Sequence, residues 1–232
     1  MNVSVINIKE DKMKKELNII TPLHKKTQRD YIGRMQDDKI VCMEIARRFD
    51  KDFWDGDRRY GYGGYKYDGR YEIVAKKLIE LYNLSDDAKI LDMGCGKGFL
   101  LYEFKKLLPN CKVYGYDISE YAIENAKEEI KDNLFIHKVQ DKTDFKDKEF
   151  DLVFSITTFH NLNLPDFKSA IEEMERLGKN KYLVVEGYRN NKELFNLQCW
   201  ALTCESFFSL EEWVWIYNTF GYTGDYEFIY FE

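Results

Sequence analysis

From residue 71 onward, short uninterrupted apolar runs alternate with longer segments in which apolar residues recur every three or four positions. The first pattern predicts buried strands and the second predicts amphipathic helices. The predicted strands are 89–94, 112–118, 134–139, 150–156, 182–188 and 225–232. The predicted helices are 71–83, 99–108, 119–131, 164–178 and 210–220, and Ser119 is a candidate N-cap. Strands that alternate with helices predict an α/β fold, with a mostly parallel sheet and helices on both faces.

Residues 1–70 carry a different pattern. Residues 1–22 are polar and unpatterned, so we expect them to be loosely attached. Between residues 28 and 49 the apolar positions fall on one face of a helix. Residues 54–70 (WDGDRRYGYGGYKYDGR) follow neither period, and ordered loops longer than about 12–15 residues are usually functional. We therefore expect residues 1–70 to form a helical and loop extension that acts as a lid on a domain of residues 71–232.

Composition and charge narrow the classes of function. Hydrophobic residues make up 44% and charged residues 33% of the chain, as in an ordinary globular protein. The net charge is +4 for residues 1–70 and −10 for residues 71–232, and an acidic main body argues against tight binding of DNA or RNA. The five cysteines form no CxxC pair, no acidic and histidine residues cluster, and no apolar run is long enough for a membrane span. We therefore expect a reduced cytoplasmic protein without a metal centre.

A glycine-rich turn follows the first predicted strand, in ILDMGCGKGFL (90–100). Glycines at such a turn let the backbone approach a ligand closely. The spacing GxGxG lacks the third glycine of a dinucleotide-binding fingerprint, since Phe99 stands there, and it lacks the GxxxxGK[ST] of a P-loop. The second predicted strand ends in Asp117, where a carboxylate is placed to hold two ribose hydroxyls.

Together, the acidic residue in LDMGCGKG, the glycine turn and the YGYDIS strand end resemble the class I S-adenosylmethionine (SAM)-dependent methyltransferases, which have a Rossmann-like fold. The resemblance runs from about residue 70 to residue 232. It implies SAM as the cofactor, with the ribose bound by Asp117 and the adenine lying against Ile118. It also implies that four residues shape the pocket for the methionine half: Asp92, Gly94, Gly96 and Gly98.

Members of this family often carry an acidic residue at the end of the third strand, where it binds the adenine amino group. Alignment on FDLV places Val139 there, so either Asp141, through a shifted turn, or Gln140 with backbone groups takes this role. Ser155, in the fourth predicted strand, completes the predicted cofactor site.

The fourth predicted strand leads into SITTFHNL (155–162), which lacks the [DN]PP[YF] motif typical of methyltransferases that act on base or glutamine amines. His160 and Asn161 follow this strand at the edge of the sheet where ligands bind. Imidazole, with an ordinary pKa near ~6.5, suits the removal of a hydroxyl proton, so His160 is the candidate catalytic base. A packing or capping role for His160 stays open, and Asn161 is a candidate for acceptor binding.

Two other segments supply candidates for acceptor binding. After the fifth predicted strand, Glu186, Tyr188 and Arg189 are expected at the mouth of the cleft. In the loop 54–70, arginines are suited to bind a carboxylate or phosphate, and tyrosines to exclude water or stack on a sugar or base. These loop candidates are Arg58, Arg59, Tyr60, Tyr62, Tyr65 and Arg70. Trp200 and Phe208, by contrast, are expected in the core.

Residues 54–70 and the end of the chain, TGDYEFIYFE, also resemble small methyltransferases of bacterial capsule and surface-polysaccharide clusters, some of them linked to O-methyl phosphoramidate decoration. This resemblance implies methyl transfer from SAM to an oxygen of a small, phosphorylated or nucleotide-linked acceptor. Three alternatives stay open: an NAD-dependent oxidoreductase, a protein- or RNA-directed methyltransferase, and a catalytically silent member of the fold that acts as a partner subunit.

Overall fold

The computed structural model of the chain describes residues 15–232, and it has a six-stranded sheet at its centre. The strands run in the order β3-β2-β1-β4-β5-β6, and every pair of neighbours is parallel. Their bounds are β1 (Lys89–Met93), β2 (Lys112–Asp117), β3 (Leu134–Ile136), β4 (Phe150–Ile156), β5 (Gly178–Glu186) and β6 (Asp225–Ile229). All six predicted strands are present, so the predicted Rossmann-like α/β fold is confirmed.

The predicted helices are present, two of them broken, and the structure adds α-helices that the sequence pattern did not predict. The bounds of the helices are α1 (Thr21–His24), α2 (Tyr31–Gln36), α3 (Lys39–Ala46), α4 (Lys51–Trp54), η1 (Arg58–Tyr60), α5 (Glu72–Tyr82), α6 (Phe99–Leu107), α7 (Glu120–Glu124), α8 (Glu128–Lys131), η2 (Phe159–Asn161), α9 (Leu164–Leu177), α10 (Asn191–Trp200) and α11 (Leu210–Thr219). The added α-helices are α1, α4 and α10. The helix expected within 28–49 is broken because Asp37 is extended and Asp38 caps a new helix at the amide of Val41. The helix expected over 119–131 begins at the predicted N-cap, Ser119, and is interrupted at the extended residue Lys127.

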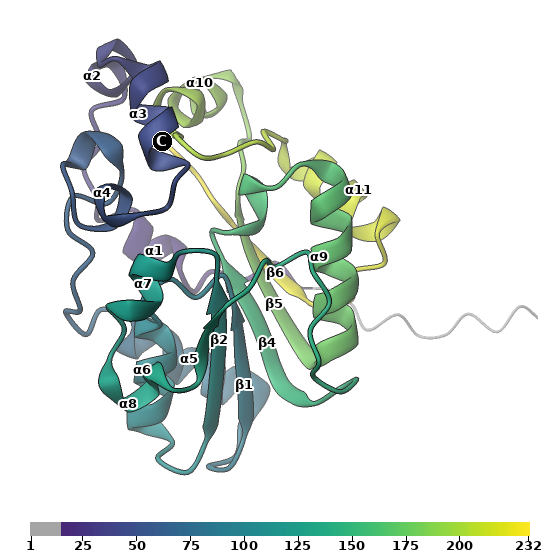
Figure 1. Cartoon of the computed structure of the whole chain (residues 1–232). Coiled ribbons are helices and arrows are strands. Elements are labelled where there is room, and N and C mark those ends of the chain that lie inside the picture. The colour runs from purple at the N-terminus through teal and green to yellow at the C-terminus, as the bar shows by residue number, and fades with distance from the viewer. Residues whose placement is uncertain (1–14) are drawn as a thin grey trace, which may run out of the picture.

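Helices cover both faces of the sheet, with α5, α6 and α8 on one face and α9 and α11 on the other (Figure 1). Alternate strand residues point to the two faces, so that Ile90 packs under α5 and α6 whereas Leu91 packs under α9. The strands carry continuous apolar runs because both faces are buried. Each fully buried side chain contributes about 1.5–3 kcal/mol. None of the helices within residues 15–232 is long and apolar enough to cross a membrane.

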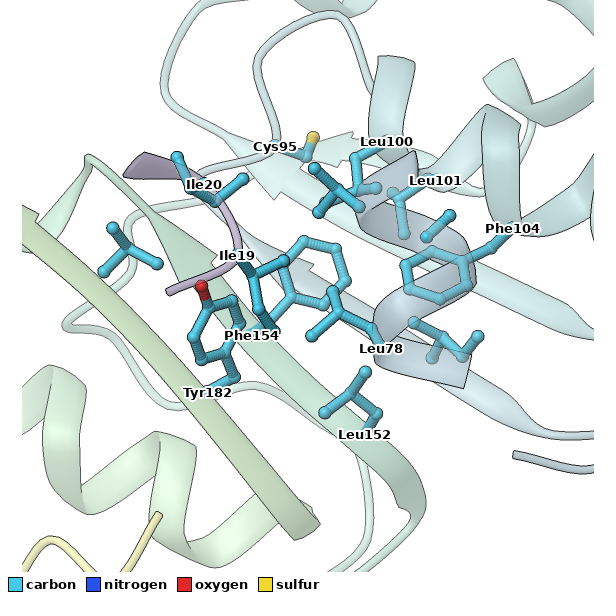
Figure 2. Close-up of a cluster of buried hydrophobic side chains, with 14 of the residues drawn as sticks. Ile19, Ile20, Leu78, Cys95, Leu100, Leu101, Phe104, Leu152, Phe154 and Tyr182 are labelled. Carbon is cyan, nitrogen blue, oxygen red and sulfur yellow. The ribbon is translucent and has the colours of Figure 1, made fainter. Parts of the chain in front are cut away.

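The segment before α1 is docked on the edge strand β6, contrary to the expectation that residues 1–22 are loosely attached. The amide of Leu17 donates to the carbonyl of Tyr226, and Ile19 and Ile20 are buried in the core beside Tyr182 (Figure 2). Residues 1–14 lie outside the described residues.

A buried carboxylate holds this segment in place. Glu227 of β6 is 1% exposed and accepts hydrogen bonds from the amides of residues 19, 20 and 21 at 2.6–3.2 Å. The hydroxyl of Tyr182 also donates to it. Four donors converge on one carboxylate, so the segment that leads into α1 has a defined position on the sheet.

Candidate functional site

A cavity of about 230 Å³, here called the cofactor cavity, lies at the carboxyl ends of β1, β2 and β4. Asp92, near the end of β1, is 6% exposed on its wall, and its Oδ1 atom has no hydrogen-bond partner within the described residues. Burial, and then the charge of Asp117, raise the pKa of Asp92 well above its usual value. A buried carboxylate without a partner is unfavourable unless a cation is bound beside it. The cavity is therefore suited to a ligand with a positive charge at this end.

The glycine turn forms the next part of the wall. Gly94 and Gly96 have φ angles of +85° and +54°, which side chains rarely adopt. A Cβ atom at Gly94 would lie 2.4 Å from the side chain of Thr158, and one at Gly96 would lie 2.7 Å from the ring of Trp54. The two glycines therefore allow η2 and the N-terminal extension to close on the turn.

Asp117 lies at the end of β2, as predicted, and its carboxylate is held by backbone amides. Oδ2 accepts from Gly96 N at 2.8 Å and Oδ1 accepts from Ser119 N at 2.9 Å. Both oxygens keep lone pairs for a ligand's hydroxyl groups. Ile118 and Gln140 also line the cofactor cavity.

Three residues predicted for the cofactor site lie outside the cavity wall. Asp141 is exposed, and the turn places Lys138, Val139 and Gln140 on the wall instead. Ser155 is buried and donates to the carbonyl of Met93, so it joins β4 to β1. Gly98 begins α6 with φ +66°, and a Cβ there would lie 2.7 Å from Ile130, so this glycine allows α8 to pack. We correct Ser155 and Gly98 to structural roles, and we assign Asp141 no part in the cavity wall.

The N-terminal extension covers the cofactor cavity with aromatic rings. Trp54 lies over Gly96, and its indole N–H donates to Ser119 Oγ at 2.8 Å. Tyr62 stacks on Trp54 with centroids 5.3 Å apart, and Tyr65 stacks on Phe99 at 5.0 Å. Apart from Ser119, these residues line the cavity, as do Phe49 and Phe53 of the same extension.

One carboxylate anchors the extension to the core. Asp55, just after α4, accepts from Lys97 Nζ at 2.6 Å and from the hydroxyl of Tyr121 at 2.8 Å. Lys97 is the residue between Gly96 and Gly98, and it also donates to the carbonyl of Tyr65. Although burial opposes the effect, the hydrogen bonds from Lys97 and Tyr121 lower the pKa of Asp55. We call Asp55, Lys97 and Tyr121 the Asp55 anchor.

A second cavity of about 690 Å³ adjoins the first. The two cavities share wall residues from both the extension and the end of β4, among them Tyr62, Tyr65, Thr157 and Asn161. Asn161 Oδ1 is buried with no hydrogen-bond partner within the described residues, so an acceptor atom stands free at the junction. The arrangement is suited to two ligands that meet at this wall.

His160 and Glu186 form a pair on the wall of the second cavity. The backbone amide of Glu186 donates to Nδ1 of His160 at 3.4 Å, so Nε2 carries the proton of the neutral ring. Nε2 lies 3.5 Å from the Glu186 carboxylate. Burial lowers the pKa of His160 to about 3, and burial raises the pKa of Glu186 to about 7. At neutral pH the carboxylate, rather than the imidazole, is therefore the group placed to take a proton.

Two non-glycine residues at the walls of the two cavities have positive φ angles. Thr157 follows β4 with φ 56°, and Phe49 follows α3 with φ 50°. Such conformations cost about 1–3 kcal/mol and occur mainly at functional sites. At Thr157 the turn brings Thr158 to the cofactor cavity and His160 to the second cavity.

The predicted acceptor-binding residues divide into two groups. Those on the wall of the second cavity are Arg58, Tyr62, Tyr65, Arg70, Asn161 and Glu186. Those outside both walls are Arg59, Tyr60, Tyr188 and Arg189.

We correct the four assignments that lie outside the walls. Arg59 is paired with Asp37, and Arg189 is paired with Glu193 and Glu232. Tyr60 packs on the small cluster of Cys42, Ala46 and Leu202. Tyr188 packs on the core, and its backbone bridges to Ser209.

Among the wall residues of the second cavity that the sequence analysis did not assign to the site, three lie close together. Arg29 and Arg34 come from the extension, and Trp200, at the end of α10, packs partly buried on the core, as expected, and also lines this cavity. No motif marks these residues, because they come from segments far apart in sequence. Phe208 packs on the core, partly buried, as expected.

The parallel sheet, the glycine turn and the two carboxylates at the ends of β1 and β2 define a SAM-dependent methyltransferase fold. A family model described as "Methyltransferase domain" matches residues 84–224, which is more than half of the chain. The chain therefore belongs to the methyltransferase domain family, for which SAM is the methyl donor. The unpartnered Asp92 carboxylate fits the positively charged methionine half of SAM, and Asp117 fits its ribose.

The chain is similar to curated proteins with different activities. It is 27% identical over 136 residues to mouse arginine-hydroxylase NDUFAF5, covering 58% of this chain and 39% of that protein. It is 31% identical over 110 residues to malonyl-[acyl-carrier protein] O-methyltransferase 1 of Ilyobacter polytropus, covering 44% of this chain and 40% of that protein. The chain thus spans under half the length of these relatives. The crystal structure of YcgJ from Bacillus subtilis shares the fold, with a TM-score of 0.50 and 19% identity over 63% of this chain and 66% of that one.

Proposed function

We propose that the chain transfers the methyl group of SAM to a hydroxyl oxygen of a small, phosphorylated or nucleotide-linked acceptor. The observation that carries the proposal is the second cavity, which meets the cofactor cavity at a shared wall and has the Glu186 carboxylate beside that wall. The name of one relative, an O-methyltransferase, supports transfer to oxygen. The resemblance of residues 54–70 to enzymes of bacterial surface-polysaccharide clusters supports a cytoplasmic step in capsule biosynthesis.

SAM, when bound, supplies a methyl group made electrophilic by the positively charged sulfur that leaves as a thioether. Asp92 would hold the positive charge of the methionine half, and Asp117 would hold the ribose hydroxyls. The Glu186 carboxylate takes the proton of the acceptor hydroxyl, which prepares the oxygen to accept the methyl group that bound SAM would supply. His160 is then a positioning residue, because its Nε2–H faces the carboxylate that acts as the base. This replaces the prediction that His160 itself is the base.

The test is transfer of label from methyl-labelled SAM to a panel of sugar phosphates and nucleotide-linked sugars, each paired with its unphosphorylated counterpart. Glu186 must be ionised to take a proton, so the rate should rise with pH through about 7. Glu186→Gln should lose about 10²–10⁴-fold in kcat and keep its affinity for S-adenosylhomocysteine. Glu211→Gln, at an exposed position of α11, is the matched control.

Each negative outcome has a separate meaning. A Glu186→Gln variant with full activity would remove Glu186 from the mechanism. Binding of S-adenosylhomocysteine without methylation of any acceptor in the panel would favour the catalytically silent scaffold. Labelling of a protein or of RNA, in place of the small molecules, would favour the macromolecule-directed alternative.

A further inference from the structure

Three arginine side chains converge on one ring at the wall of the second cavity. The guanidinium carbons of Arg34, Arg58 and Arg29 lie 4.3, 5.0 and 5.5 Å from the ring centroid of Trp200. Arg34 is 8% exposed, Arg29 is half-buried and Arg58 is exposed at the rim. They come from α2, from the loop before it and from η1, so the folded extension brings them together.

None of these three arginines forms an ion pair within the described part of the chain. Several arginines outside the cavity walls, by contrast, do form ion pairs. Arg59, Arg176 and Arg189 are each paired with a carboxylate. Arg34 and Arg58 instead donate to backbone carbonyls, at 2.6 Å and 2.5 Å.

Arg29 also donates to backbone carbonyls, those of His24 and Thr27, at 3.2 Å and 2.9 Å. Its Nε–H is buried without a partner. The three charges therefore stand together with donor capacity left over, and no carboxylate of residues 15–232 lies within ion-pair distance of them.

This arrangement is unfavourable without an anion. Burial lowers the pKa of Arg34, and the charge of Arg58 lowers it further, while Cys42 and Asp37 oppose the effect. Burial likewise lowers the pKa of Arg29, and the Arg58 charge adds to the effect while Tyr31 and Glu186 oppose it. Like charges that repel at a cavity wall favour binding of an anion between them, which removes the repulsion and completes their hydrogen bonds.

The wall as a whole selects for a strongly negative group. Six basic side chains line the second cavity, against two acidic ones. One bidentate arginine satisfies a carboxylate, whereas a tetrahedral phosphate with two charges has oxygens for several guanidinium groups. The methionine carboxylate of SAM is a poorer candidate, because Arg29, Arg34 and Arg58 line only the second cavity and not the cofactor cavity.

We propose that Arg29, Arg34 and Arg58, arranged around Trp200, form the site that binds the phosphate group of the acceptor. The inference rests on the proposed function, since it assigns the second cavity to the acceptor. The inference adds that recognition of the acceptor requires its phosphate group. It also adds that two of the three arginines that bind this phosphate precede the loop 54–70. The acceptor hydroxyl must then lie within reach of Glu186 when the phosphate is bound at Trp200.

The experiment titrates inorganic phosphate into the full chain by calorimetry, with and without saturating S-adenosylhomocysteine, and uses acetate as the carboxylate probe. Arg58→Met and Arg59→Met form a matched pair, because the two residues are adjacent in η1 but only Arg58 lines the cavity. We expect Arg58→Met to weaken phosphate binding about 10- to 100-fold, as for loss of hydrogen bonds to a charged group, and Arg59→Met to leave it unchanged. Arg29→Gln, which keeps polarity without charge, should weaken it in the same direction.

The outcomes separate this inference from the proposed function. Equal phosphate affinity in the wild type and Arg58→Met, or no phosphate binding by the wild type at millimolar concentration, would overturn the phosphate site. Acetate bound as tightly as phosphate would also overturn it, in favour of a carboxylate acceptor. An unchanged affinity for S-adenosylhomocysteine and an unchanged circular dichroism spectrum show that each variant is folded. Failure of the wild type to bind S-adenosylhomocysteine would count against the proposed function, whatever the phosphate titration gives.

Discussion

Asp55→Asn should destabilise the protein by about 3 kcal/mol, a large effect for one surface-proximal carboxylate. The substitution keeps the size of the side chain but removes the charge that accepts from Lys97 at 2.6 Å and from Tyr121 at 2.8 Å. Lys97 is 4% exposed, so its ammonium group is left with little access to water. The expected cost is therefore that of an uncompensated buried charge, and not that of a lost surface ion pair.

The magnitude follows from the exposure of the two side chains. The side chain of Lys97 is 5% exposed and that of Asp55 is 21% exposed, so solvent screens their interaction only weakly. Removing one partner of a buried pair costs about 3–5 kcal/mol. In the variant, Lys97 still donates a hydrogen bond to the carbonyl of Tyr65 at 2.9 Å, so we expect a loss of stability at the lower end of this range. For a chain of this size, about 3 kcal/mol corresponds to a fall in Tm of about 6–12 °C.

Urea unfolding, followed by far-ultraviolet circular dichroism, measures this change. A double-mutant cycle with Lys97→Met should give a coupling energy of at least ~1.5 kcal/mol, because the double variant leaves no unpaired charge. Asp52→Asn, at an exposed position of α4, is the control. A loss below about 1 kcal/mol for Asp55→Asn, or strict additivity in the cycle, would refute the reasoning.

The pH dependence checks the same interaction. The pKa of Asp55 is lowered in the folded state, so its stabilisation is complete above the ordinary value of 3.8 and is lost as the pH falls through the lowered value. The difference in stability between the wild type and Asp55→Asn should therefore shrink in acid. A difference that stays constant from neutral pH to strong acid would contradict the assignment.

Two further substitutions test groups with opposite expected effects. Asp92→Asn should stabilise the ligand-free protein by about 1 kcal/mol at neutral pH, since burial raises the pKa of Asp92. The same substitution should weaken S-adenosylhomocysteine binding about 10- to 100-fold. Thermal melts measure the first effect and calorimetry the second, and the absence of either would contradict the reasoning. Glu227→Gln should destabilise the protein by about 2–4 kcal/mol, because an amide NH₂ would face the backbone donors of residues 19–21. Urea unfolding measures the change, and Glu16→Gln, at an exposed position, is the control.

The sequence predicted the parts of the fold that depend on local pattern. The strands were found because a parallel sheet buried on both faces requires mainly apolar runs such as KILDM and FDLVFSI. Asp92, the glycine turn and Asp117 were found because strand ends and a following helix fix their position along the chain. The bounds of β5 and the breaks after α2 and α7 were missed, since they depend on single capping or extended residues.

The second cavity could be predicted only in part, because it is made by tertiary contacts. Arg29 and Arg34 lie in a stretch where basic residues are ordinary, and only the packing of α2 against α10 brings them to Trp200. Arg58 and Arg59 look equivalent in sequence, but Asp37 pairs with Arg59 and leaves Arg58 at the cavity. The pKa values of His160 and Glu186 are set by burial, which the order of residues does not reveal.

The attachment of residues 19–21 to Glu227 sets an order of events during synthesis. The two partners are 206–208 residues apart in sequence. The hydrogen bonds to Glu227 therefore cannot form until β6 has left the ribosome, long after the strands at the centre of the sheet have emerged. The extension that follows residue 21 supplies rings to the cofactor cavity and arginines to the second cavity, so both sites must be assembled late. A nascent chain halted before residue 227 lacks the carboxylate that binds residues 19–21, so it should bind SAM poorly.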